Sequence, residues 1–240
     1  MGEKILIWIL IVVGAGLFVS LLAFVRPWIE RRRRETVQAF AEAQGFSYFA
    51  KERSDFWRRL VRILGCDQPF FGRVKNIIRG VHRDRDLIGC DISYRQPRAS
   101  ASRRRPAFRR GDEDNWLSAC VCRLDSRFPR LLVCEKGLFQ RLLDTLGSGQ
   151  VELQPEEFRT QFHVACREPG FAREVLHPGM IQWLLQHPGW RFTVNDDLVI
   201  VTDNNRWTPD EYLEALDVTT GFLDHIPDSV REKYCGKAGA

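Results

Sequence analysis

The chain has 240 residues, of which 44% are hydrophobic and 11% aromatic, and its formal net charge is +5. This length and apolar content exclude a chain that is disordered throughout, and they favour one folded domain or two small ones. The charge is uneven, because residues 26–110 hold 22 basic and 9 acidic side chains, whereas residues 111–240 hold 13 basic and 21 acidic ones. The basic half predicts attraction to an anionic surface, with mutual complementarity of the two halves as the alternative.

The first predicted element is a transmembrane helix at Ile5–Val25. This run of 21 residues contains no charged side chain, and at about 1.5 Å per residue it would reach roughly 31 Å, enough to cross a bilayer. A cleaved signal peptide would have a shorter apolar run and a small-residue cleavage site. Arginines follow the run at Arg26 and Arg31–Arg34, whereas only Glu3 and Lys4 precede it. The positive-inside rule therefore predicts a single-pass protein of the cell membrane, with its N-terminus outside and its soluble part in the cytoplasm.

The next predicted elements alternate between helix and strand. Apolar residues at helical spacing predict helices over residues 30–44 and 55–64, with a short strand over residues 46–48 between them. Residues 74–94 predict a hairpin around a charged turn at 82–86. The seven cysteines are odd in number and most lie in apolar runs, which indicates buried free thiols in a reducing compartment.

Residues 95–114 have the most unusual composition. They contain seven arginines, together with Pro, Ser, Ala and Gly, and this mixture predicts a disordered or mobile loop. The alternatives are a solvated insertion between two strands and a loop that binds nucleic acid or acidic lipid. Phe108 is its one aromatic side chain, so base stacking, and with it nucleic-acid binding, is disfavoured. The candidate polyanion-binding residues are Arg103, Arg104, Arg105, Arg109 and Arg110.

Beyond this loop, strands and helices follow one another without long gaps. The predicted strands are residues 116–124, 128–133 and 162–166, with a hairpin that joins residues 190–194 to 198–201. The predicted helices are residues 138–146, 170–186 and 209–223. Thr208 and Glu211 form a predicted capping box, with Pro209 at the first helical position.

This element order predicts an α+β fold, in which an N-terminal transmembrane helix precedes a soluble domain with a mostly antiparallel sheet and packed helices. Residues 1–29 are the predicted anchor and its flank, and residues 30–235 are the predicted soluble domain. A candidate sub-boundary lies at the Arg-rich loop, residues 95–114, and a candidate C-terminal unit spans residues 150–230.

Several scattered motifs carry a family resemblance. A G-F-x-Y segment spans Gly45–Tyr48, and an N-x-x-x-G segment spans Asn76–Gly80. An A-x-x-x-L-x-P stretch lies at Ala172–Pro178, and the last predicted helix leads to Ile226–Pro227. Together they resemble a group of uncharacterised bacterial membrane-anchored proteins that share a domain of unknown function. The resemblance implies a cytosolic α+β domain on a membrane tether, and it brings no known activity or site.

Common signatures of catalysis and metal binding are absent from the sequence. The chain has no G-x-x-x-x-G-K-[ST], no G-x-G-x-x-G, no H-E-x-x-H and no G-x-S-x-G. Cys120 and Cys122 lack a second pair of ligands for zinc. His163 and Cys166 would face opposite sides of a strand. We therefore predict no catalytic residue, no cofactor and no metal site.

The favoured function is a membrane-tethered cytosolic interaction module, whose partners are the membrane and another protein. One alternative is a membrane-anchored enzyme whose site is assembled from distant residues. A second alternative is binding of anionic lipid or nucleic acid through the basic half. The residues predicted to lie near the membrane or its lipids are Arg26, Arg31, Arg32, Arg33, Arg34, Arg58, Arg59 and Arg62.

Overall fold

The computed structural model describes residues 25, 27–52, 54–64, 73–95, 114–136, 151, 155–203 and 205–235. Its strands form one sheet: β1 (Ser47–Phe49), β2 (Arg73–His82), β3 (Arg85–Arg95), β4 (Asp114–Glu135), β5 (Phe162–Cys166) and β6 (Arg191–Thr202). Their order is β1-β2-β3-β4-β5, and β6 pairs with the other edge of β4. Every pairing is antiparallel, so the predicted α+β class with a mostly antiparallel sheet is confirmed.

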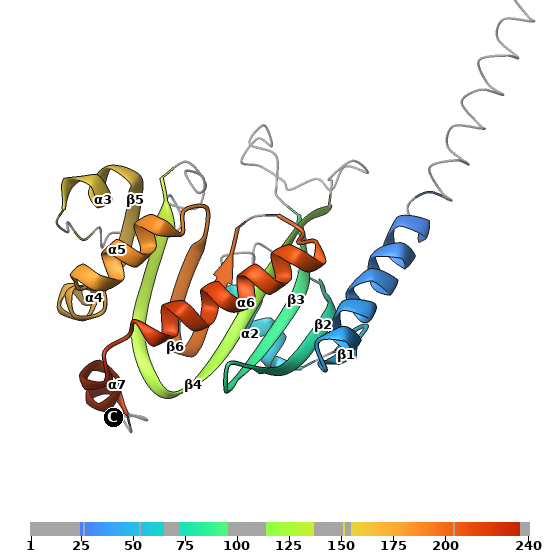
Figure 1. The fold of residues 1–240 in the computed structure, drawn as a ribbon, viewed down its shortest axis with the longest axis horizontal. Helices are drawn as coiled ribbons and strands as arrows, with labels where there is room; N and C mark the ends of the chain where they lie inside the picture. Colours follow the sequence, from blue (N-terminus) through green and yellow to red (C-terminus); the bar gives the residue numbers. More distant parts are fainter. Residues whose placement is uncertain are drawn as a thin grey trace, which may run out of the picture.

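Helices cover both faces of this sheet (Figure 1). The described helices are the N-terminal helix (residues 25 and 27–43), α2 (Asp55–Ile63), α3 (Glu156–Gln161), α4 (Pro169–Val175), α5 (Pro178–Gln186), α6 (Pro209–Asp224) and α7 (Asp228–Tyr234). Helix α6 crosses the front of the sheet, α2 lies behind it, and α3, α4 and α5 gather at one end. The N-terminal helix packs into the same hydrophobic cluster as α6, whereas α2 belongs to the separate cluster on the other face.

Helix α2 illustrates how local sequence positions an element on the sheet. Trp57, Leu60 and Leu64 recur at helical spacing and are buried against the sheet, whereas Arg58 and Arg62 point to solvent. Amphipathic spacing of this kind drives a helix to bury one face and expose the other. The helix predicted at residues 55–64 is therefore confirmed.

The largest difference from the predicted elements is that two pairs of strands predicted as separate are each one long strand. Residues 116–124 and 128–133 belong to one strand, β4, and the predicted hairpin at 190–201 is one strand, β6. The two strands pair along most of their length and bend together (Figure 1), with register shifts between Arg123 and Leu131. Asp196 lies opposite Phe128 in this bend and has a φ of +58°. The turn-forming residues therefore mark a shared β-bulge and do not reverse the chain.

Proline divides another predicted element. The helix predicted at residues 170–186 is two helices, α4 and α5, which meet at Leu176 and His177. Pro178 disfavours a helical conformation at the residue before it and begins the next helix well. The predicted cap is present on α6, where the Thr208 hydroxyl accepts a hydrogen bond from the Glu211 N–H and the Glu211 side chain accepts one from the Thr208 N–H.

The predicted hairpin at residues 74–94 is confirmed as β2 and β3. Its turn residues, Arg83 and Asp84, have φ of +48° and +61°, as a two-residue type I′ turn requires. The strand predicted at residues 162–166 is confirmed as β5. The helix predicted at residues 138–146 and the Arg-rich loop between residues 96 and 113 lie outside the described residues.

The predicted transmembrane helix, single-pass topology and membrane location require correction. Within the described ranges, no helix is long and apolar enough to cross a membrane. The helix described in this region, residues 27–43, carries Glu30 and Arg31–Arg34 near its start, and such charges are costly in a hydrocarbon core. Residues 1–24, which contain nearly all of the apolar run, lie outside the described residues.

The two N-terminal sequence motifs lie on neighbouring strands and contact each other. The Phe46 ring lies over Gly80, where a Cβ atom would be 1.9 Å from Phe46 Cδ1. The Tyr48 hydroxyl donates a hydrogen bond to Asn76 Oδ1 at 3.0 Å. Strand pairing aligns the motifs, because Tyr48 is opposite Ile78 in the register of β1 and β2. The G-F-x-Y and N-x-x-x-G segments are therefore two halves of one packing unit.

Candidate functional site

A buried carboxylate, Asp91 on β3, is the most densely bonded polar group that the structure describes. Its side chain is fully buried, because alternation along β3 points it into the layer between the sheet and the helices on the front face. Five side chains from five different segments donate hydrogen bonds to it: Arg33, Asn76, Ser118, Arg206 and Tyr212. We call Asp91 and these five residues the Asp91 centre.

The donors are shared equally between the two carboxylate oxygens. Oδ1 accepts from Arg33 Nη2 at 2.9 Å, the Ser118 hydroxyl at 2.7 Å and the Tyr212 hydroxyl at 2.9 Å. Oδ2 accepts from Arg33 Nε at 3.0 Å, Asn76 Nδ2 at 2.8 Å and Arg206 Nε at 3.1 Å. A carboxylate offers about four lone-pair directions, so six donors leave no free direction for a substrate or a metal ion.

The position of Asn76 depends on a bulge in β2. Asn76 has a φ of +49°, and the register between β2 and β3 shifts between Lys75 and Ile78. Asparagine tolerates this left-handed conformation better than most residues, and the bulge redirects its side chain toward Asp91. The hydrogen bond from Tyr48 occupies Asn76 Oδ1 and so orients the amide N–H toward the carboxylate.

A second ion pair ties the N-terminal helix to the same centre. Arg206 donates to Glu30 Oε1 at 2.7 Å as well as to Asp91, and Lys75 lies 3.3 Å from the other Glu30 oxygen. The cations of Arg206 and Lys75 also lie 4.1 and 4.8 Å from the centre of the Trp116 ring. Glu30 and Arg33 are three residues apart on the N-terminal helix, so both lie on the same helix face. The network therefore holds the helix at two points and fixes its angle to the sheet.

The electrostatics of the Asp91 centre suit a structural role. Burial alone would raise the pKa of Asp91, but hydrogen bonds and charge from Arg33, with further contributions from Asn76 and Arg206, lower it from 3.8 to about 2. Burial and the nearby Asp91 charge raise the pKa of Tyr212 well above 10. Groups with such values keep their protonation states near neutral pH, whereas general acid–base catalysis needs a pKa near the working pH.

This shifted pKa makes acid stability a test of the centre. A folded-state pKa of about 2 against 3.8 contributes roughly 2 kcal/mol above pH 4, and this contribution is lost as the pH falls from about 4 toward 2. We expect carboxyl ¹³C NMR of the folded protein to show one aspartate that stays ionised at pH 3, and we expect the free energy of unfolding to fall between about pH 4 and pH 2. If every aspartate titrated near pH 4, the network would not be formed as described.

The buried thiols also lack the properties of nucleophiles. Burial raises the pKa of Cys120 to about 12 and the pKa of Cys122 and Cys134 to about 11. The thiolate is the reactive form, so these side chains stay protonated at neutral pH. Cys90 and Cys166 are also free and buried, as predicted. Cys66 lies outside the described residues.

The arginines predicted near the membrane do not share one surface. On the N-terminal helix, Arg31, Arg32 and Arg34 are exposed, whereas Arg33 points inward and belongs to the Asp91 centre. The Arg31 guanidinium pairs with Glu35 at 3.0 Å. Arg26 lies outside the residues whose side chains are described. Four successive residues of a helix face different directions, so these arginines cannot all face a membrane. Arg33 binds Asp91, and its prediction as a membrane-facing residue was wrong.

The arginines of α2 lie on the opposite side of the sheet from the N-terminal helix. Arg58 and Arg62 are exposed there, whereas Arg59 binds Asp196 at 2.8 Å and also contacts Asp197. Asp196 and Asp197, which lie between the two arms of the predicted hairpin, thus pair with an arginine side chain. The ion pairs of Arg59 therefore connect α2 to the bend shared by β4 and β6.

Three further features of the sequence are the Arg-rich loop, the candidate metal ligands and the His163–Cys166 pair. The candidate polyanion-binding residues lie outside the described residues: Arg103, Arg104, Arg105, Arg109 and Arg110. Among the side chains that the structure does describe, no group of three His, Cys, Asp or Glu residues is placed to hold a metal ion. His163 is half-buried and Cys166 buried in the alternating pattern of β5, so the two face opposite sides as predicted.

The start of the N-terminal helix has an exposed apolar face in addition to the face that packs on the sheet. Val25, Trp28 and Ile29 are 37%, 58% and 48% exposed, and residues three and four apart share a face of a helix. The Arg32 guanidinium carbon lies 5.3 Å from the centre of the Trp28 ring and continues this face. We call Val25, Trp28 and Ile29 the Trp28 stripe. The helix rises away from the sheet at this end (Figure 1).

Comparisons with known proteins give the fold alone. No family model matches the chain, and no curated protein matches it. The crystal structure of the mycobacterial trehalose monomycolate transport factor A, TtfA, is similar, with a TM-score of 0.54 and 13% sequence identity. The similarity covers 81% of this chain and 96% of that one. At this identity the two proteins share a fold, and no residue role is transferred between them.

The sequence contained few signals for the Asp91 centre. Asp91 is a single acidic residue between buried Cys90 and Ile92, and a charge inside an apolar strand is the one feature that could have drawn attention to it. Its partner Arg206 lies 115 residues away in the chain. Nothing local relates the two, so only the folded structure brings them together.

Proposed function

We propose that this chain is a non-catalytic binding module that docks a partner protein through the Trp28 stripe. One observation carries the proposal: three large apolar side chains are exposed on one face of a helix whose other face is bonded to the sheet. Clustered exposed apolar side chains mark interaction surfaces, and tryptophan is prominent among residues that dominate binding energy. The protonated thiols and the saturated Asp91 carboxylate support a role in binding over a role in chemistry.

The charges around the stripe indicate the chemistry of the partner. Arg31, Arg32 and Arg34 are exposed beside it, so a complementary surface combines an apolar groove with carboxylates at its rim. A second copy of this chain would bring like charges together, which disfavours self-association through the stripe. The Asp91 centre supports this function by holding the helix in one orientation, because a preorganised element loses less entropy on binding.

The structural neighbour is compatible with such a role. TtfA is described as a transport factor, and a binding module that acts on a partner fits that general description. The fold covers nearly the whole of that chain. What is transported there is a property of that protein, and the partner proposed here rests on the stripe alone.

The proposal is tested by site-specific photocrosslinking of the full chain in cells. A photoreactive phenylalanine analogue at position 28 or 29 should capture one reproducible partner, identified by mass spectrometry. With that partner purified, Trp28→Asp should weaken binding about 30-fold, the effect of losing a dominant interface residue. The fold should be unaffected, because Trp28 is more than half exposed.

Gln38→Asp is the matched control for this experiment. Gln38 is exposed on the same helix, about 15 Å along the axis from Trp28 at roughly 1.5 Å per residue, and the substitution introduces the same charge. The control should bind as the wild type does. Absence of any reproducible crosslinked partner, or equal weakening by both substitutions, would remove the Trp28 stripe as a docking site.

A further inference from the structure

The outer edge of β1 is a second, separate feature that the proposed function does not use. β1 is the terminal strand of the described sheet, and no described strand pairs with it on the side away from β2. The Asn76 N–H donates to the Ala50 carbonyl at 3.2 Å. Backbone N–H and C=O groups of successive residues in an antiparallel strand point alternately to its two sides. The backbone groups of Tyr48 therefore face β2, as those of Ala50 do, whereas the backbone groups of Ser47 and Phe49 face outward.

Apolar side chains accompany these outward backbone groups. Phe49 is 42% exposed, and Val81 on β2 is 62% exposed. Phe49 is opposite Ile77 in the register, and Ile77 shares a sheet face with Arg79 and Val81 because they alternate along β2. Phe49 and Val81 therefore belong to the same face as α2. Ser47, which lies opposite Arg79, is also exposed.

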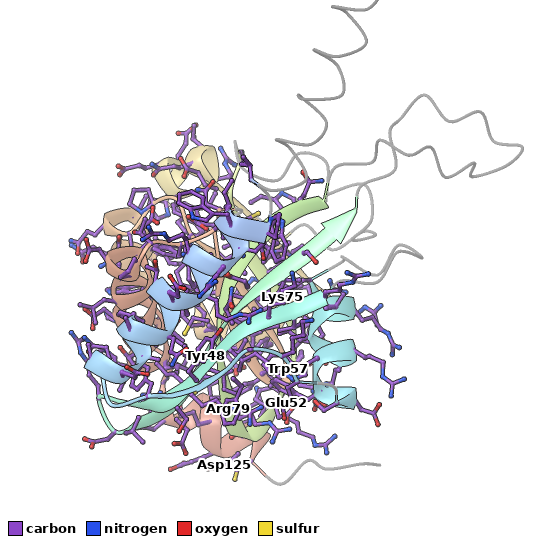
Figure 2. The ribbon with its side chains drawn as sticks, turned by 90° about the vertical axis from the view of Figure 1, so that its right-hand side faces the viewer. Tyr48, Glu52, Trp57, Lys75, Arg79 and Asp125 are labelled. Carbon is purple, nitrogen blue, oxygen red and sulfur yellow. The ribbon has the colours of Figure 1, made fainter. Side chains whose placement is uncertain are left out.

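The side chains beside this edge contact and hydrogen-bond one another. The Arg79 guanidinium carbon lies 5.4 Å from the centre of the Phe49 ring and 5.9 Å from that of Trp57. Glu52 accepts hydrogen bonds from both Arg79 and the Trp57 indole N–H. Figure 2 shows Glu52, Trp57 and Arg79 gathered on this side of β1 and β2. Because Glu52 pairs with Arg79, this arginine does not present an unpaired charge to an incoming segment.

We propose that the β1 edge binds an extended segment of a partner protein, which adds to the sheet as a further strand. The outward N–H and C=O groups of Ser47 and Phe49 supply main-chain hydrogen bonds, and Phe49 with Val81 receives apolar side chains at alternate positions of the segment. A strand of three residues gives a peptide-sized contact. Two folded copies joined only there would bury less than the roughly 1,200 Å² of a stable interface, so a flexible segment is favoured over a second copy.

The test uses a random 12-residue peptide library displayed on phage and selected against the full chain. We expect enriched peptides with apolar residues at alternate positions. A synthetic peptide of the enriched sequence should lose about tenfold in affinity, measured by fluorescence anisotropy, when backbone nitrogens of one alternate phase are methylated. Methylation of the other phase should leave the affinity unchanged. Equal tolerance of both phases, or no enrichment, would overturn the proposal.

Protein variants locate the peptide on the edge. Phe49→Lys and Val81→Lys should each weaken peptide binding at least about tenfold. Both chains should stay folded in thermal unfolding, because both side chains are exposed and Val81 lies opposite Asp86. Leu213→Lys on α6 is the matched control, since Leu213 is also an exposed apolar residue, and it should bind normally. A dimer of the wild-type chain that Phe49→Lys abolishes in sedimentation would assign the edge to self-association and overturn the proposal.

Discussion

Asp91→Ala is expected to lower the free energy of unfolding by about 3–5 kcal/mol, the usual loss when one partner of a buried ion pair is removed. The carboxylate is fully buried, and the cations of Arg33 and Arg206 would be left beside it with side chains only 13% and 19% exposed. Three neutral donors would also lose their acceptor: Asn76, Ser118 and Tyr212. Chemical denaturation followed by circular dichroism measures the loss.

Two comparisons make this prediction specific to the centre. Asp125→Ala removes an exposed carboxylate from β4 and should unfold as the wild type does. Combining Asp91→Ala with Arg33→Met should restore part of the stability, because an apolar side chain in place of a buried cation needs no counter-ion. Hydrogen exchange should meanwhile show the N-terminal helix losing protection before the sheet in the single variant. Wild-type stability of Asp91→Ala would show that the six hydrogen bonds do not hold the fold.

Gly80→Ala is expected to destabilise the protein by about 1–3 kcal/mol through overpacking. A Cβ at this position would lie 1.9 Å from Phe46 Cδ1 and 2.6 Å from two further atoms of the same ring. Phe46 is buried between the N-terminal helix and the sheet, so its ring cannot move aside without disturbing the helix. Thermal or chemical unfolding of the purified variant measures the effect.

A double-mutant cycle attributes the loss to the Phe46 ring. Phe46→Ala alone should cost about 3–5 kcal/mol because it leaves a cavity. The double variant should be more stable than the sum of the two losses by at least about 1 kcal/mol, because the second change removes the clash. Gly170→Ala is the control, since no atom lies within 4 Å of a Cβ there. Strict additivity would contradict the close packing of the two motifs.

The Asp91 centre and the Phe46–Gly80 contact act on the same element. One fixes the first half of the N-terminal helix through ion pairs, and the other fixes the chain where the helix ends and β1 begins. The Trp28 stripe and β1 therefore lie on the same segment of the chain, which the Asp91 centre and the Phe46–Gly80 contact attach to the rest of the sheet. We expect variants that loosen either contact to reduce binding at both surfaces without removing any residue that touches a partner.

The sequence by itself determined the elements whose signals are local. Apolar spacing determined α2, alternation determined β2, β3 and β5, and the capping residues Thr208 and Glu211 determined the start of α6. The α+β class followed from the order of these elements. Each of these features depends on residues within one or two turns or strands of each other, so a short window of sequence contains the physical information.

Only the tertiary structure decided the features that depend on distant residues. The residues around Asp196 and those just before Phe128 were predicted to separate strands, but pairing of β4 with β6 makes them a shared bend. Arg33 resembled its three neighbours in sequence, yet its direction on the helix and the burial of Asp91 make it structural. Asp91 has its structural role only in the folded chain. Its hydrogen-bond donors come from a helix, strands and a loop that are distant in the sequence, and no local pattern relates these segments to one another.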